Sequence, residues 1–276
     1  MDYIKNFENY MIGNRKSYNT IKEYKSLVSD FINYINKDPK NINDVDIENY
    51  KRHLAVDKRY SKASQYLSMK AIKLFFQSLD LKVPRTLTAP RRNKKIPVYL
   101  STNEAKNLIK ASSNNKKHLA IVSLLLYSGI RVSELCNLKI EDVDLNENII
   151  YIRSGKGGKD RIAIIPDECS KILRSYYNDR LNYPGDTFFI SNKKSKYSTS
   201  TIERLIKKLA RMANIEKHVT PHVLRHTFAT SVLRNGGDIR FIQQILGHAS
   251  VATTQIYTHI DDGTLKDMYQ KHRPDY

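Results

Sequence analysis

The chain has 276 residues, of which 40% are hydrophobic, so it is long enough for one large or two modest domains with buried cores. Lys and Arg number 47 against 28 Asp and Glu, and this net charge of +19 predicts a polyanionic partner, because phosphate neutralisation drives nucleic-acid binding. No apolar run reaches the roughly 18 residues that span a bilayer, and the N-terminus lacks the apolar centre of a signal peptide, so we expect a cytoplasmic protein without a membrane partner.

Residues 1–82 show helical periodicity throughout. An acidic first turn marks one helix start near residue 44, and a serine precedes another at residue 62. The strongest apolar stripe lies between them and the N-terminus, and consists of Ile21, Tyr24, Leu27, Val28, Phe31, Tyr34 and Ile35. We therefore predict four short helices that form a small bundle within residues 1–88.

A basic segment with several prolines follows this bundle. Proline pushes the residue before it out of helical conformation, so residues 89–97 are predicted to be an extended linker. Its basic side chains could be solvated, or they could lie along a phosphate backbone; they are Arg91, Arg92, Lys94 and Lys95. Residues 1–97 hold 20 basic and 10 acidic residues and the rest holds 27 and 18, which favours two basic lobes that clamp a duplex.

Residues 98–276 are predicted to form a second, mixed domain. It opens with the capping-box spacing of Ser101 and Glu104, and a strongly apolar helix then ends at Gly129. Residues 149–165 read as two short strands around a turn rich in Gly and Lys. Further helices are expected at about 199–213, 221–235 and 239–246, with a last one from Ser250. The fold class is therefore mainly α, with a small β-sheet in the second domain.

Polar residues stand at the ends of these elements. Arg131 follows Gly129 within an apolar stretch, and Glu134 could hold its guanidinium through a charge-assisted pair. A structural ion pair and a functional arginine are equally open here. Lys156 lies in a glycine-rich turn, where a solvated hairpin lysine is the alternative and Lys159 competes for any role. A phosphate-binding Walker A loop is excluded, because a strand rather than a helix follows.

The predicted helix after Thr220 begins with a candidate anion site. His222 and Arg225 share its first turn, where the backbone N–H groups already favour an anion. His222 and His226 could instead be metal ligands, although the Glu of an HExxH motif is missing. Further along, His248 could be a helix cap and Tyr257 a packing residue. The combined set is the inventory needed to attack a phosphodiester without a metal: Arg131, Lys156, His222, Arg225, His248 and Tyr257.

Four segments, in order, closely resemble the signature boxes of tyrosine recombinases, the phage-integrase family, and most closely those of its Xer-type group. They are SGIRVSELCNL, GKGGKDRIAIIP, HVLRHTFATSVL and LGHASVATTQIYTH. The resemblance implies a SAM-like core-binding domain over residues 1–88 that clamps DNA. It also implies a basic linker over 89–97 and a mostly helical catalytic domain over 98–276.

The resemblance also implies residue roles. Arg131 and Arg225 would grip the scissile phosphate, as bidentate guanidinium groups suit the charge of a pentacoordinate phosphorane. Lys156 would protonate the leaving 5′-oxygen, and Glu134 would orient Arg131 or a nearby histidine. His222 would be an acid or base near the nucleophile, and His248 would bind the phosphate. Tyr257 would be the nucleophile.

The implied activity is site-specific DNA recombination through a 3′-phosphotyrosyl intermediate and a Holliday junction, as in chromosome-dimer resolution during the cell cycle. No metal, ATP or cofactor is expected. The implied partners are a palindromic double-stranded DNA site and further protomers, as a tetramer on paired sites, with a paralogue or DNA translocase as possible additions. In the family a C-terminal helix docks on a neighbouring protomer, here through Leu265, Met268 and Tyr269. The alternatives are a topoisomerase IB-like enzyme, a mobile-element integrase and a non-catalytic DNA-binding regulator.

Overall fold

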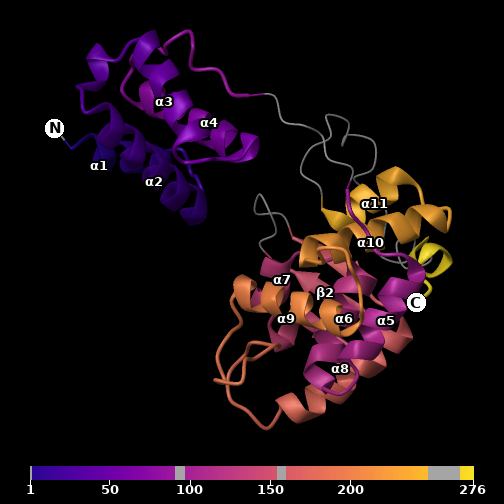
Figure 1. The fold of residues 1–276 in the computed structure, drawn as a ribbon. Helices are drawn as coiled ribbons and strands as arrows, with labels where there is room; N and C mark the ends of the chain where they lie inside the picture. Colours follow the sequence, from indigo (N-terminus) through magenta and orange to yellow (C-terminus); the bar gives the residue numbers. More distant parts are fainter. Residues whose placement is uncertain (1, 91–96, 154–159, 248–267) are drawn as a thin grey trace. The chain divides into compact units, whose positions relative to one another are not determined.

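The computed structural model describes residues 2–90, 97–153, 160–247 and 268–276. They belong to two compact units, Met1–Lys95 and Ile96–Tyr276 (Figure 1). Among the residues described, no helix combines the length and the apolar character needed to cross a bilayer. Several residues singled out in the sequence lie outside the described ranges, namely Arg91, Arg92, Lys94, Lys95, Lys156, Lys159, His248, Leu265 and Tyr257.

The first unit is the predicted bundle of four α-helices. Ser17 and Ser61 cap the second and fourth helices through hydrogen bonds from Thr20 and Ser64 backbone N–H groups. Aromatic side chains dominate the core, and Phe31 packs edge-on against Tyr50 at a ring distance of 5.0 Å. The helices are α1 (Tyr3–Gly13), α2 (Tyr18–Ile35), α3 (Asp44–Val56) and α4 (Lys62–Ser78), with a 3₁₀ turn at Pro39–Asn41.

The predicted apolar stripe of α2 is correct at its centre and wrong at one edge. Val28 and Phe31 are fully buried, whereas Tyr34 is 41% exposed. Tyr34 stacks instead on His53 of α3, with ring centroids 4.3 Å apart. The stripe is wider than the surface that α2 buries, so its outermost aromatic residue covers a neighbouring side chain rather than the core.

The second unit is built around helix α6, whose residues from Ala120 to Ser128 are all buried. Helices α5, α8 and α10 contact it. Two helices, α7 and α8, were not predicted. Helix α7 is short, and α8 is rich in charge and begins after Pro166 without a side-chain cap. The helices are α5 (Thr102–Ser112), α6 (Lys116–Ser128), α7 (Val132–Asn137), α8 (Asp167–Arg180), α9 (Thr199–Met212), α10 (Pro221–Arg234) and α11 (Ile239–Leu246).

A small antiparallel sheet completes this unit. The two predicted strands are confirmed as β2 (Ile149–Ile152) and β3 (Arg161–Ile164), with Ile152 paired to Arg161. A third strand that was not predicted, β1 (Val143–Asp144), pairs with β2 and is only two residues long. Strands β2 and β3 form one hairpin. Arg161, the first residue of β3, follows the Gly/Lys segment that contains Lys156 by a few residues in the sequence.

The C-terminal segment 268–276 packs on its own unit. Tyr269 is fully buried among side chains of α10 and α11, and its hydroxyl donates to the carbonyl oxygen of Tyr127 at 2.6 Å. The Tyr276 ring lies 5.3 Å from the ring of Tyr127, and Arg273 pairs with Glu168 at 2.7 Å. In this structure Tyr269 therefore fills a site in its own chain, which differs from the expected docking on a neighbour.

Candidate active site

The turn between α6 and α7 positions the first candidate residue, Arg131. Gly129 ends α6 with a φ of +62°, and a Cβ there would lie 2.5 Å from Cδ1 of Phe228, so both conformation and space require glycine. Arg131 then occupies the N-cap position of α7. One oxygen of Glu134 accepts the Arg131 backbone N–H at 2.7 Å, and the other accepts its Nη1 at 2.7 Å. Glu134 thus fixes both the backbone and the guanidinium of Arg131.

Arg225 approaches the same point from α10. Thr220 caps this helix and Pro221 is its first residue, as predicted, which sets the position of the first turn. The Arg225 side chain is buried, and it donates from Nη1 to the Gly129 carbonyl oxygen at 2.6 Å. Burial and then the charge of Arg131 lower the pKa of Arg225 to about 10, so its guanidinium stays positive at neutral pH.

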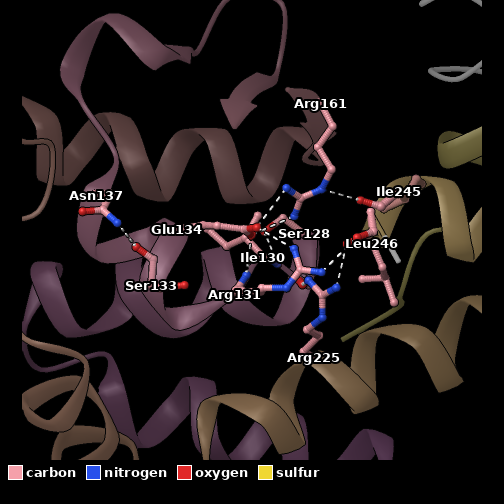
Figure 2. A network of polar contacts seen from close by, with 12 residues as sticks. Ser128, Ile130, Arg131, Ser133, Glu134, Asn137, Arg161, Arg225, Ile245 and Leu246 are labelled. Carbon is pink, nitrogen blue, oxygen red and sulfur yellow. Dashed lines mark hydrogen bonds and ion pairs between the residues drawn. The ribbon is translucent and has the colours of Figure 1, made fainter. Parts of the chain in front are cut away.

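The C-terminal end of α11 closes the cluster (Figure 2). Its last carbonyl groups lack partners within the helix and carry the negative end of the helix dipole. Three guanidinium groups from separate elements satisfy them. Arg131 Nη2 donates to Gly247 at 2.9 Å, Arg225 Nη2 to Leu246 at 2.6 Å and Arg161 Nε to Ile245 at 3.1 Å. The backbone immediately before His248 is therefore held by the arginine cluster.

Arg161 was not assigned any role from the sequence. It stands at the start of β3 and donates to both carboxylate oxygens of Glu134, at 2.7 and 3.1 Å. Burial of the Glu134 carboxyl would raise its pKa, but the hydrogen bonds from Arg161 and Arg131 outweigh burial and lower it. A signal was present in the sequence, since Arg161 lies within the quoted segment GKGGKDRIAIIP, directly before its apolar residues.

The predicted histidine His222 lies on the first turn of α10, three residues before Arg225, with its side chain exposed. His226, one turn further, is also exposed. Neighbouring atoms still remove the His226 ring partly from water, and this desolvation, followed by the charges of His222 and Arg225, lowers its pKa. Within the described ranges, no group of three or more His, Cys, Asp or Glu side chains is placed to hold a metal ion. The structure thus brings together Arg131, Glu134 and Arg225, with His222 on the same helix as Arg225.

The charge and the N–H donors of the described cluster would suit an anion. Three guanidinium groups and one carboxylate meet, which leaves a formal charge of +2 at neutral pH. Guanidinium groups present planar forks of N–H donors that match phosphate oxygens. The surroundings are largely dry, because Arg225 is 7% exposed, and electrostatic attraction is stronger in such an environment than in water. The chemistry that fits is stabilisation of a phosphate group whose negative charge increases during reaction.

The sequence patterns of two known domain families match the two units. The phage integrase family matches residues 98–264, and the phage integrase N-terminal SAM-like domain matches residues 3–82. Tyrosine recombinase XerA of Pyrococcus furiosus is 37% identical, over 98% of this chain and 93% of that protein. Tyrosine recombinase XerC of Thermodesulfovibrio yellowstonii is 32% identical, over 99% and 96%. The chain therefore belongs to the tyrosine recombinase, or phage integrase, family.

Solved structures agree with this membership. The crystal structure of a XerA recombinase is 61% identical in sequence, with a TM-score of 0.55 over 100% of this chain and 99% of that one. XerH recombinase bound to its difH substrate is 24% identical, with a TM-score of 0.69 over 90% of this chain and 78% of that one. At that identity the second likeness shows the fold, which is the predicted mainly helical, two-domain arrangement with a small sheet.

Proposed function

We propose that this chain is a site-specific DNA recombinase in which Tyr257 attacks the scissile phosphate and forms a 3′-phosphotyrosyl bond. The observation that carries the proposal is the convergence of Arg131 and Arg225 beside the end of α11, eleven residues before Tyr257. The tyrosine oxygen forms a bond to phosphorus, the bond to the 5′-oxygen breaks, and a free 5′-hydroxyl leaves. The reverse reaction with another strand's 5′-hydroxyl joins new partners through a Holliday junction.

Arg131 and Arg225 stabilise the transition state in this scheme. The non-bridging phosphate oxygens gain negative charge as phosphorus becomes pentacoordinate. Fixed guanidinium groups therefore bind the transition state more tightly than the ground state. Arg225 donates to the carbonyl oxygen of Leu246, the last residue of α11, and Arg131 to that of Gly247 directly after it, which fixes the direction of both guanidinium groups. Glu134 orients Arg131 by accepting its N–H groups.

The other proposed roles rest on the family's motifs. Lys156 donates a proton to the departing 5′-oxygen, and His222 acts as acid or base near the tyrosine hydroxyl. His248 hydrogen-bonds the phosphate. A free tyrosine has a pKa of about 10, so Tyr257 is a weak nucleophile unless neighbouring positive charge favours its phenolate. The two arginines supply that charge. The covalent bond conserves the energy of the phosphodiester, so rejoining requires neither ATP nor a metal ion.

The proposed partner is a palindromic double-stranded DNA site, bound by the bundle of residues 1–88 and the domain of residues 98–276, with the basic linker 89–97 along the backbone. The net charge of +19 supports this partner. The XerH structure, named as bound to a difH recombination substrate, supports the same class of DNA. The likeness to Xer recombinases supports two further parts of the proposal, a tetramer on two paired sites and a role in chromosome-dimer resolution.

A nicked duplex that carries the chain's own recombination site tests the chemistry. Cleavage near the nick releases a short strand, so the wild-type protein should accumulate as a covalent protein–DNA adduct on a denaturing gel. The Tyr257→Phe variant lacks the attacking oxygen, and it should bind the duplex without forming an adduct. A covalent adduct from this variant would show that Tyr257 is not the nucleophile. Relaxation of supercoiled DNA that carries no such site would instead indicate a topoisomerase.

A further inference from the structure

Arg161 makes an interaction that differs from an ordinary surface ion pair. Its side chain is 12% exposed and that of Glu134 is 8% exposed. The guanidinium engages both carboxylate oxygens, and its Nε also donates to the Ile245 carbonyl oxygen of α11. One side chain of β3 therefore contacts α7 and α11 at once (Figure 2). Gly247 lies against it, since a Cβ there would be 2.8 Å from Cδ of Arg161.

The charges explain why a third arginine matters. Glu134 is the carboxylate that holds Arg131, and its negative charge would cancel that of Arg131 if the two formed an isolated pair. Arg225 would then be the only uncompensated cation of the cluster. With Arg161 on the same carboxylate, the charge of Glu134 is balanced from the side of β3. Two positive charges then remain for the phosphate, and a phosphorane with two negative charges matches them.

We propose that Arg161 is a positioning residue for strand cleavage: it neutralises Glu134, so that Glu134 can orient Arg131 without cancelling its positive charge. The inference rests on the proposed function, because it assigns Arg161 a part in the same reaction. Arg161 acts through Glu134 and Arg131, and its guanidinium is already committed to the carboxylate and to Ile245. It also fixes the start of β3 against α7.

A purely structural role for Arg161 makes different predictions. A buried pair that only holds β3 to α7 would lower stability when broken, and less folded protein would react. Such a decrease in folded protein reduces the final amount of adduct. Misplacement of Arg131 instead slows the reaction of every folded, DNA-bound molecule. The rate constant and the amplitude of one turnover therefore separate the two roles.

The experiment measures adduct formation on the nicked duplex with saturating protein, together with DNA affinity and thermal unfolding. In Arg161→Met the rate constant should fall about 100-fold, the effect of a small misplacement at a reacting centre, while DNA affinity and amplitude hold. Arg161→Lys retains the charge, and its rate constant should be at least about tenfold higher than that of Arg161→Met. The double variant Arg161→Met/Glu134→Gln should recover similarly, because no negative charge then opposes Arg131.

A matched control lies at the other side of the same hairpin. The Arg153 side chain is 60% exposed and pairs with the buried Asp142 at 2.5 Å, and Arg153→Met should react at the wild-type rate. If the wild-type protein forms no adduct, the proposed function itself is wrong. If the wild type reacts and Arg161→Met keeps its rate constant, or loses only amplitude and thermal stability, the role of Arg161 is overturned. The same holds if neither Lys nor the double variant recovers the rate.

Discussion

At the scale of single residues, Arg225 combines burial with a positive charge that the proposed reaction requires. Two of its N–H groups donate to the carbonyl oxygens of Gly129 and Leu246, which offsets part of the cost of removing the guanidinium from water. Burial and Arg131 still lower its pKa to about 10. Arginine tolerates such a decrease at neutral pH because its ordinary pKa is so high. The ordinary pKa of lysine lies closer to neutral pH, so an equal decrease would bring it near the pH of the reaction.

Arg225→Lys should therefore make cleavage dependent on pH in a range where the wild type is not. A similar lowering would bring a lysine from about 10.4 to about 8. The cation that binds phosphate is present below the lysine's pKa and disappears as pH rises through it. We expect the ratio of variant to wild-type adduct rates to fall between about pH 7 and pH 9. A constant ratio across this range would contradict the electrostatic account of Arg225.

At the scale of elements, the turn from α6 to α7 sets the geometry of the cluster. Gly129 brings this turn against Phe228 of α10 and Leu246 of α11, both fully or nearly fully buried. Its carbonyl oxygen also accepts the hydrogen bond from Arg225. A change at Gly129 consequently affects the packing of three helices and the direction of one arginine together.

Gly129→Ala should lower the free energy of unfolding by about 2–4 kcal/mol, from left-handed strain and overpacking together. Urea unfolding followed by circular dichroism measures this change. Gly13→Ala is the matched control, because it ends helix α1 and a Cβ there meets nothing within 4 Å. That control should be neutral or slightly stabilising. Equal stability of the two variants would refute the packing argument at Gly129.

At the scale of the whole molecule, positive charge is shared by both units rather than confined to the site. The segment 1–97 holds 20 basic against 10 acidic residues, and it includes the linker cluster Arg91, Arg92, Lys94 and Lys95. The two hypotheses for this cluster, solvated side chains and binding to DNA phosphates, differ in their dependence on salt. Each neutralised phosphate releases counterions, so its contribution is visible in the salt dependence of affinity.

Replacing all four linker residues with glutamine should weaken DNA binding at low salt. It should also make the slope of log K against log salt shallower, by about 0.9 for each phosphate that the linker no longer neutralises. Titrations at several salt concentrations measure both. Arg91→Lys/Arg92→Lys keeps the charge and should keep the slope. An unchanged slope in the glutamine variant would show that the linker is solvated in the complex.

Much of this molecule could be predicted from local sequence, and the failures have two causes. The four helices of residues 1–82 and the hairpin β2–β3 follow from periodicity. The pair of Arg131 and Glu134 is local, three residues apart, and was predicted as an ion-pair candidate. Arg161 was missed because its partner Glu134 lies 27 residues earlier and only tertiary structure joins them. Helix α8 was missed because its charged residues obscure the apolar face that contains Cys169 and Leu173.

The end of α11 gives the arginine cluster one further property. The carbonyl oxygens of Ile245, Leu246 and Gly247 there accept hydrogen bonds from Arg161, Arg225 and Arg131. In the proposed reaction, a substrate phosphate would meet guanidinium groups that these hydrogen bonds have already gathered against their mutual repulsion. Such preorganisation lowers the reorganisation needed at the moment of reaction. The carbonyl groups at the end of α11 would thus assemble the cluster before the phosphate of the proposed reaction binds.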